Sequence, residues 1–448
     1  MQQSALRWVT VLLMQKTLRL LFSALLSLVL VACGGKGDSA SAPLDFVATA
    51  GDGQVTLTWT AAPGVEYWLW YAPGTLAAGQ DILQASGHRS AQPATSPFIL
   101  AVNNANAPYT FTIDGRTGGG PGGPKAAFQY ATSRPAGTNW TAGNLNTTTT
   151  NTLRAATFGQ DSSGAYNFLA VGDTRTLYYK STTDADSANW TQITSATTIG
   201  INANLNAAVY ASGRFLVGDS TGNIYYSTDL STWTATASRP ASINAMATNG
   251  TAAVAVGNGG VVWYAADGIT WVAATAVPAG TPNLRGVSYL ASGYWVAVGD
   301  SGTIWLSTDA VNWFVPTGYT AVSQSLYGVA YRPALTINPV DGSAVTYSAQ
   351  YVFVGSSGRY VSTNDLTTWS SGTVAGAANL TAVSGTASQF LAVDSAGKAF
   401  KLVDGTTWSS AITASSAGLN AAINTMGLLN ITARYVAVGA NGQIVYSR

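Results

Sequence analysis

Cysteine, histidine and glutamate are almost missing from this sequence, which limits the chemistry available to it. The chain has 448 residues but only one of each of these types: Cys33, His88 and Glu66. With a single cysteine, no disulfide can form within the chain, so stability must come from packing. With a single histidine, a metal site built from several histidines is excluded.

Charge is also scarce. Lysine, arginine, aspartate and glutamate together make up 9% of the residues. Arg7, Lys16 and Arg19 lie in the N-terminal segment described below, which leaves 17 basic against 19 acidic side chains in the rest of the chain. That balance gives no electrostatic reason to bind nucleic acid or an anionic membrane surface. We therefore predict no nucleic-acid partner.

Sequence motifs for cofactors are missing as well. The many glycines lie in turns between predicted strands and form no phosphate-binding or dinucleotide-binding pattern. No Asp-x-Asp-x-Asp-Gly cluster for calcium occurs, and the nearest stretch, residues 182–190, is interpreted as an enlarged hairpin turn. We predict neither a cofactor nor a metal ion.

The first 33 residues have the pattern of an export signal. Arg19 precedes the apolar run "LLFSALLSLVLVAC", which closes on small residues and Cys33. Residues 1–33 resemble a bacterial lipoprotein signal, whose final cysteine is acylated and becomes the first mature residue. This resemblance implies an exported protein, held by lipid in the cell envelope; Gly34, in place of a retention aspartate, favours the outer membrane. The alternatives are an ordinary signal with an incidental cysteine and a start at Met14.

The mature chain divides near residue 136. Residues 34–42, "GGKGDSASA", are predicted to be a flexible tether. In the next segment Val55, Leu57 and Trp59 alternate with polar residues, as in a half-buried strand. "GDGQVTLTW" and "APYTFTI" resemble the B strand and the start of the F strand of a fibronectin type III domain, with Trp59 in the core and Tyr109 at the tyrosine corner. We expect residues 43–136 to form such a domain.

Residues 137–448 repeat one phrase, for example "VGDSGTIWLSTDAVNW". Tryptophans close the phrases at intervals of 38 to 56 residues: Trp140, Trp190, Trp233, Trp271, Trp313, Trp369 and Trp408. Val-Gly pairs recur with the same period, ending at Gly172, Gly218, Gly257, Gly299, Gly355 and Gly439, and Asp394 replaces the glycine once. Each unit contains four short β-rich runs, such as "LRGVSYL", "YWVAVGD", "TIWLST" and "NWFVPT". This period, with four strands per unit, predicts the blades of a β-propeller.

The number of units predicts seven blades. The incomplete last unit predicts how the ring closes. The last unit, "INTMGLLNITARYVAVGANGQIVYSR", stops after three strands, whereas "TNWTAG" around Trp140 precedes the first complete unit. We expect the strand at Trp140 to pair with the C-terminal strand in one blade, which would leave only short edges exposed. The predicted fold is therefore all-β: a small fibronectin type III-like sandwich followed by a seven-bladed β-propeller in residues 137–448.

In five units an aspartate lies four residues before the closing tryptophan. The pairs are Asp229 and Trp233, Asp267 and Trp271, Asp309 and Trp313, Asp365 and Trp369, and Asp404 and Trp408. These phrases resemble the Asp-box, or BNR, repeat of sialidases, a hairpin between the third and fourth strands of a blade. The resemblance implies an aspartate that accepts backbone N–H bonds and a tryptophan buried between sheets. It implies a structural role, because such hairpins lie far from the family's active site.

The resemblance to sialidases does not extend to their catalytic groups. Sialidases of this fold use an arginine triad, a Tyr/Glu nucleophile pair and an Asp acid, but Glu66 lies outside the repeats and so does His88. We therefore assign no catalytic residue. The wording of the repeats also resembles photosystem-assembly-factor-like propellers, many of which serve as interaction platforms. Two classes of function stay open. One is a non-catalytic lipoprotein that binds a protein or glycan, and the other is a carbohydrate-active enzyme, sialidase-like or another glycosidase, using Asp and Tyr on one face. The scarcity of glutamate and histidine favours binding.

The candidate ligand site is a set of residues near the start of each unit's first strand. Alignment of the units selects Arg154, Asn206, Asn244, Arg285, Tyr327, Thr381 and Asn424, each preceded by Leu or Ile. In a propeller these positions converge on one face, and we expect none of them to need a polar side chain for the blade to form. Two arginines among such donors would suit an acidic or carboxylate-bearing protein or glycan. The alternative is that these side chains only satisfy water and backbone groups in the central channel.

The lipid anchor can be tested by replacing the cysteine. Cys33→Ala should leave the chain unprocessed or soluble, because no other apolar segment of about 20 residues follows that could hold a membrane. Fractionation and mass spectrometry of the unaltered mature protein should find acyl chains on Cys33 and an outer-membrane location. Recovery of an unacylated mature protein from the soluble periplasm would contradict both expectations.

Overall fold

The computed structural model describes most of the chain after the predicted signal. The described residues are 37–50, 54–85, 87–90, 92–101, 108–132, 137–182, 184, 188–194, 200–237, 239, 241–339, 345–386, 389–402, 405–425 and 435–447. Cys33 and Asp404 lie outside them, so their predicted roles stay predictions. Within these ranges, no helix is long and apolar enough to cross a membrane.

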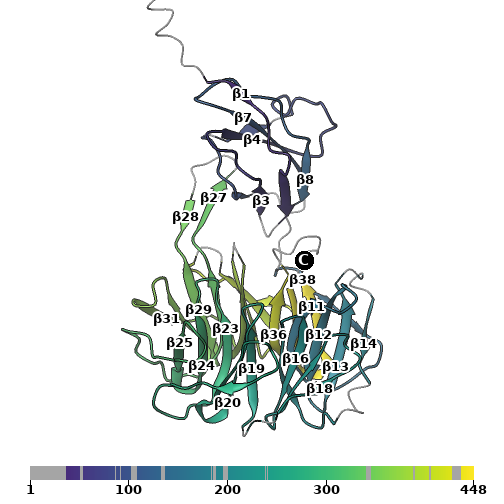
Figure 1. Ribbon diagram of the computed structural model, residues 1–448, viewed down its shortest axis with the longest axis vertical. Helices are drawn as coiled ribbons and strands as arrows, with labels where there is room; N and C mark the ends of the chain where they lie inside the picture. The colour runs from purple at the N-terminus through teal and green to yellow at the C-terminus, as the bar shows by residue number, and fades with distance from the viewer. Residues whose placement is uncertain are drawn as a thin grey trace, which may run out of the picture. The chain divides into compact units, whose positions relative to one another are not determined.

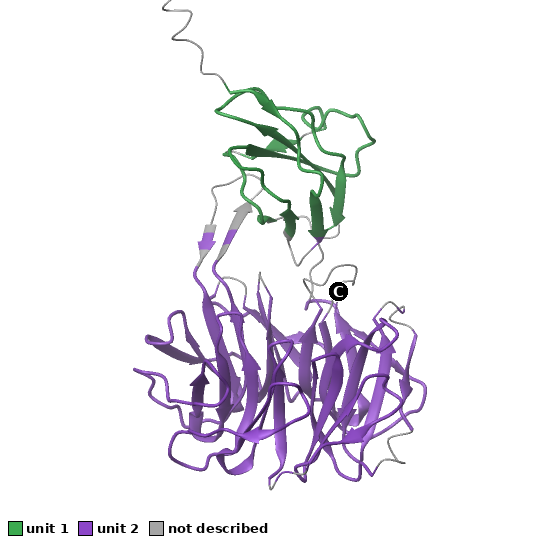
Figure 2. Ribbon diagram, in the orientation of Figure 1, with its two compact units in different colours: residues 1–49, 55–100, 107–132 green, residues 50–54, 101–106, 133–448 purple. Residues whose placement is uncertain are grey.

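The chain forms two compact units, coloured separately in Figure 2. Unit 1 covers residues 1–49, 55–100 and 107–132, and unit 2 covers the rest. The strands of the N-terminal unit are β1 (Ser39–Ala40), β2 (Val47–Ala50), β3 (Gln54–Thr58), β4 (Glu66–Pro73), β5 (His88–Arg89), β6 (Phe98–Ala101), β7 (Pro108–Arg116) and β8 (Gln129–Thr132). In one sheet β4 pairs with β5 and with β7, and both β1 and β8 pair with β7. In the other sheet β3 lies between β2 and β6.

The core of unit 1 follows from the alternation in its sequence. Val55, Leu57 and Trp59 are all buried, whereas Thr58 between them is exposed. The ring of Trp59 packs against Phe46 and Tyr67, with centroids 6.3 and 5.9 Å apart. The predicted tether is not free over its whole length, because β1 pairs with the end of β7 and fixes residues 39–40 to the sheet.

The described strands of unit 2 form sheets of neighbouring antiparallel strands, numbered here in chain order (Figure 1). The first contains β10 (Asn144–Leu145), β11 (Leu153–Gln160), β12 (Tyr166–Gly172), β13 (Thr176–Ser181) and β14 (Asn189–Gln192), where β10 alone is parallel to its neighbour. The second contains β15 (Leu205–Ala211), β16 (Arg214–Asp219), β17 (Ile224–Ser227) and β18 (Thr234–Ala235). The third contains β19 (Ile243–Thr248), β20 (Ala253–Gly257), β21 (Val262–Ala265) and β22 (Val272–Ala273).

The later sheets repeat the same order of strands. The fourth contains β23 (Leu284–Tyr289), β24 (Trp295–Gly299) and β25 (Ile304–Ser307), and the fifth contains β26 (Leu326–Arg332), β29 (Gln350–Gly355), β30 (Arg359–Thr363) and β31 (Trp369–Thr373). The sixth contains β32 (Leu380–Gly385), β33 (Phe390–Asp394), β34 (Lys398–Leu402) and β35 (Ile412–Thr413). The seventh contains β36 (Leu419–Asn424), β37 (Tyr435–Gly439), β38 (Ile444–Ser447) and β9 (Thr141–Ala142). Short 3-10 turns η2 (Asn258–Gly260), η3 (Asp300–Gly302), η4 (Ser356–Gly358) and η5 (Ala440–Gly442) join second to third strands.

The first strands of successive sheets lie against one another. These contacts run from β11 through β15, β19, β23, β26 and β32 to β36, which lies against β11. Sheets of three to five strands packed in this way have the architecture of a β-propeller. The short strand β9 near Trp140 pairs with β38 at the other end of the repeat region, and Gly137 N–H donates to Ser447 Oγ at 2.7 Å. Trp140 itself is half-buried.

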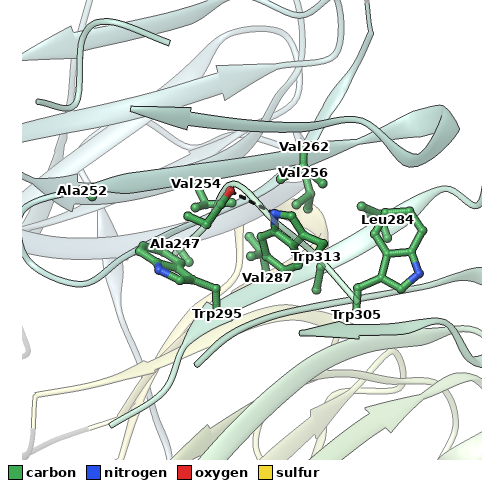
Figure 3. Close-up of a cluster of buried hydrophobic side chains, with 12 residues drawn as sticks. Ala247, Ala252, Val254, Val256, Val262, Leu284, Val287, Trp295, Trp305 and Trp313 are labelled. Carbon is green, nitrogen blue, oxygen red and sulfur yellow. Dashed lines mark hydrogen bonds between the residues drawn. The ribbon is translucent and has the colours of Figure 1, made fainter. Parts of the chain in front are cut away.

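Tryptophans fill the space between neighbouring sheets, as Figure 3 shows for the third and fourth. Trp295, Trp305 and Trp313 are each 5% exposed or less and pack against the valines of β20 and β21. The indole N–H of Trp313 donates to the carbonyl of Ala310 at 2.9 Å, which satisfies its buried polar atom. The apolar faces of these sheets are thus buried by packing against the neighbouring sheet.

The glycine of the Val-Gly pairs is required by a close backbone approach. Where it ends the second strand, a Cβ atom would lie 2.0 to 2.4 Å from the carbonyl oxygen of the residue before the first strand, as at Gly172, Gly257, Gly299, Gly355 and Gly439. In the second sheet the Val-Gly pattern predicts that Gly218 occupies this position. In the structure the first residue of the first strand, Leu205, pairs with Asp219 instead. Asp219, like Asp394, accepts two backbone N–H groups of the following turn.

One sheet carries an insertion between its first and second strands. Strands β27 (Leu335–Pro339) and β28 (Val345–Tyr347) follow β26 and pair with each other as a hairpin. This insertion accounts for the 56-residue interval before Trp369.

The pairing of β9 with β38 can be tested by deletion. Removing residues 137–143 eliminates β9 and the bond from Gly137, exposes the edge of β38, and should cost about 3 kcal/mol or more of unfolding free energy. Removing the chain through residue 132 takes away unit 1 and should affect the unfolding of unit 2 far less, since separate domains fold independently. Calorimetry of both truncations measures this, and equal destabilisation would contradict the pairing.

Candidate functional site

A β-bulge recurs at the second residue of each first strand in unit 2. The pairing of β23 with β24 shifts between Leu284 and Gly286, and equivalent shifts occur in the other sheets. The residues left out of register are Arg154, Asn206, Asn244, Arg285, Tyr327, Thr381 and Asn420. We call these seven residues the bulge ring, because they occupy the same end of neighbouring strands. A bulge re-aims the side chain it carries, and bulges are common next to functional sites.

The alignment of units chose the wrong asparagine in the last sheet. The stretch "LNAAIN" offers two candidates, Leu419–Asn420 and Ile423–Asn424, and sequence spacing selected Asn424. Leu419 pairs with Gly439, so the bulge falls on Asn420. Asn424 lies at the opposite end of β36, where it pairs with Tyr435 and its amide donates to Ser384 Oγ at 2.6 Å.

Four members of the bulge ring connect one sheet to the next. Each donates a side-chain hydrogen bond to the carbonyl oxygen of the first residue of the following first strand. The bonds run from Asn206 to Ile243 at 3.0 Å, from Asn244 to Leu284 at 2.8 Å, from Thr381 to Leu419 at 2.7 Å and from Asn420 to Leu153 at 2.9 Å. Three of the predicted positions, Asn206, Asn244 and Thr381, therefore use their polar side chains to satisfy a buried backbone carbonyl, which was not expected from the sequence.

The two arginines of the ring form ion pairs instead. Arg154 Nε lies 2.5 Å from Asp173, and Arg285 binds Asp300 through Nε and Nη2 at 2.8 and 3.1 Å. The arginine side chains are 41% and 42% exposed. The guanidinium of Arg285 lowers the pKa of Asp300, with smaller contributions from Asn283 and Ser325. Both arginines keep further N–H donors, because a guanidinium carries five.

This end of the sheets carries an excess of positive charge. We call it the turn face; here the first strands begin and the second strands turn into the third. Among the described residues, five cationic side chains on this face are exposed or half-buried, and only two carboxylates are. The cations are Arg154, Arg175, Arg285, Arg359 and Lys398, and the carboxylates are Asp173 and Asp300. Asp219 and Asp394 are fully buried in their turns. The turn face therefore attracts anions.

The opposite end of the sheets is acidic, because the hairpins between third and fourth strands lie there. Asp229, Asp267, Asp309 and Asp365 are exposed, and each accepts two backbone N–H groups of its own turn. Those from Thr270 and Ile269 lower the pKa of Asp267 to about 2. The paired tryptophans Trp233, Trp271 and Trp313 are buried, whereas Trp369 and Trp408 are half-buried. The aspartates thus stabilise the hairpin turns, and the tryptophans contribute to packing.

Glu66 and His88 both lie in unit 1, as the sequence indicated. Glu66 begins β4, and His88 is exposed on β5 and stacks on Tyr71. In the described residues no three His, Cys, Asp or Glu side chains are grouped to hold a metal ion.

Comparison with known proteins supports the architecture. The family described as the DUF6242 beta propeller domain has a sequence model that matches residues 134–294. Among solved structures, the chain is similar to one described as "YCF48 bound to D1 peptide", at 16% identity and a TM-score of 0.51, over 69% of this chain and 96% of that one. YCF48 from Cyanidioschyzon merolae is 14% identical with a TM-score of 0.49, over 69% and 98% of the two chains. No curated protein matches the chain.

The fold of unit 2 is a β-propeller. At these identities the likeness extends to the fold alone, and the residues of the site must be argued from their own geometry. Bulge positions could have been found by pairing each Leu or Ile with the glycine or aspartate that ends the second strand. The connecting hydrogen bonds between sheets leave no such signal in the sequence.

The connecting role of the asparagines can be tested at adjacent sheets. Asn244→Leu leaves the carbonyl of Leu284 without its donor and should lower the unfolding free energy by about 1–2 kcal/mol. The matched variant Arg285→Leu, at the same bulge in the next sheet, removes only an exposed ion pair and should cost less than about 1 kcal/mol. Urea denaturation followed by tryptophan fluorescence compares them, and an equal or larger loss for Arg285→Leu would refute the assignment.

Proposed function

We propose that this chain is a non-catalytic binding protein that holds an acidic segment of a partner protein on the turn face of its propeller. The observation that supports this most directly is the pair of exposed arginines in the bulge ring. Four ring positions are occupied by inter-sheet hydrogen bonds, whereas Arg154 and Arg285 point their charge at single aspartates and keep donors for a ligand. A carboxylate is the group that a guanidinium binds best.

The charge around these arginines suits an acidic partner. Arg175, Arg359 and Lys398 add positive charge to the same end of the sheets. Such a field speeds the encounter with an acidic segment and weakens as salt increases. The similar YCF48 structure contains a peptide, which favours a protein as the partner here over an acidic glycan.

The aspartates of the propeller favour binding over hydrolysis. A glycosidase needs two carboxylates that face each other across the substrate. In the described propeller Asp173 and Asp300 bind arginines, Asp219 and Asp394 hold turns, and the hairpin aspartates accept backbone N–H groups. These carboxylates therefore already have structural partners, and no observation favours the enzyme alternative.

The proposal includes the architecture and location expected from the sequence. We infer that the sheets of unit 2 are seven blades closed by β9 and β38, which is supported by the contact of β36 with β11. We infer a fibronectin type III-like domain in unit 1, supported by the division of its strands into β2-β3-β6 and β5-β4-β7-β8. We further propose that acylation of Cys33 holds the protein at the outer membrane, facing a partner in the cell envelope.

The double variant Arg154→Ala with Arg285→Ala tests the turn face. Capture of envelope proteins by the immobilised chain from residue 34 onward should fall by about tenfold, with an unfolding midpoint close to that of the wild type. Arg359→Ala removes a cation from the rim of the same face and serves as the control, which should lose less. Wild-type capture should also weaken with added salt. Undiminished capture by the double variant would rule out this face as the site.

A further inference from the structure

A cavity of about 230 Å³ lies at the end of the first strands opposite the bulge ring. It is lined by the last residues of β23, β26 and β32, which are neighbouring first strands. The side chains that shape it are Ser288, Tyr289, Val329, Tyr331, Val383 and Ser384. The arginines of the turn face lie at the other end of these strands, so the cavity belongs to a separate site.

We propose that this cavity binds the ring of a neutral saccharide. None of its lining side chains is charged, in contrast to the turn face. A buried or half-buried charge on a ligand would find no counter-charge here, so the cavity selects against charged ligands. Its volume lies below that of a site for a drug-sized molecule, which matches a single ring rather than an extended chain.

The two tyrosines supply flat surfaces that are already held in place. Tyr289 packs on Trp295 with ring centroids 4.9 Å apart, and Tyr331 packs on Tyr351 at 4.7 Å. Within the described part of the chain neither tyrosine hydroxyl has a hydrogen-bond partner, so both are available to a ligand. An aromatic ring with a polar tip matches the two sides of a sugar, whose C–H face is apolar and whose edge carries hydroxyl groups.

A network of hydrogen bonds positions the serine hydroxyls of the cavity. Ser384 is 8% exposed, and its Oγ accepts a bond of 2.6 Å from the amide of Asn424, which also donates to the carbonyl of Gly385 at 3.2 Å. Since its oxygen already accepts from Asn424, the proton of Ser384 is left to donate to a ligand oxygen. Ser288 donates to the carbonyl of Val329 at 3.1 Å, which leaves its oxygen as an acceptor. Donor, acceptor and aromatic faces are thus presented from rigid strands.

The test uses the chain from residue 34 onward, which contains every described residue. The probes are the methyl glycosides of glucose, galactose, mannose and N-acetylglucosamine, with N-acetylneuraminic acid as the charged comparison. Saturation-transfer difference NMR should detect at least one neutral glycoside with a Kd of about 1–10 mM, and no signal from the charged sugar.

Two variants and a matched control locate the binding. Tyr289→Ala and Ser384→Ala should each weaken it by about tenfold, through loss of the ring surface and of the donor. Tyr166→Ala is the control: Tyr166 and Tyr289 are both 37% exposed, but Tyr166 starts the second strand of the first sheet. Binding that survives both cavity variants, preference for the charged sugar, or no signal from the four glycosides overturns the proposal. Because the turn-face arginines stay intact in these variants, failure here leaves the turn-face proposal unaffected.

Discussion

The close approach of two backbones at the start of each first strand is the constraint on which the propeller depends. There the second strand ends on a glycine whose missing Cβ leaves room for a carbonyl oxygen, or on an aspartate that holds the next turn. The bulge that follows shifts the register of the two strands by one residue just after this crowded point. Because all seven first strands begin in this way, successive sheets can pack side by side and bury their tryptophans between them.

The bulge fixes where a side chain lies, whichever residue type occupies the position. Backbone geometry places the ring residue, so the same position can carry an amide that connects two sheets or a guanidinium that faces solvent. Asn244 and Arg285 show the two uses in adjacent sheets. Function can therefore differ between propellers of this kind without any change in how the sheets pair.

Charge is distributed between the two ends of the sheets by the turns they use. The hairpins with aspartates place ionised carboxylates at one end, where backbone N–H groups stabilise the charge at Asp267 and its equivalents. Arg154, Arg175, Arg285 and Arg359 lie at the other end, on the turn face. Near the acidic end, between β23, β26 and β32, the cavity is free of charged side chains, so the two proposed sites would select opposite kinds of ligand.

Local patterns in the sequence determined the fold class, the repeat and the hairpins, because each depends on residues close together in the chain. Spacing predicted β-rich units, and the resemblance to the Asp-box repeat implied buried tryptophans such as Trp313 and the aspartate turns. The scarcity of glutamate favoured binding over sialidase chemistry. Only the tertiary structure decided between Asn420 and Asn424, or between Gly218 and Asp219, since each choice rests on pairing with a strand outside the local pattern. The bonds from Asn206 and Asn244, and the cavity at Ser384, join strands about 40 residues apart in the chain. No local period encodes such contacts, because they exist only once neighbouring sheets have packed.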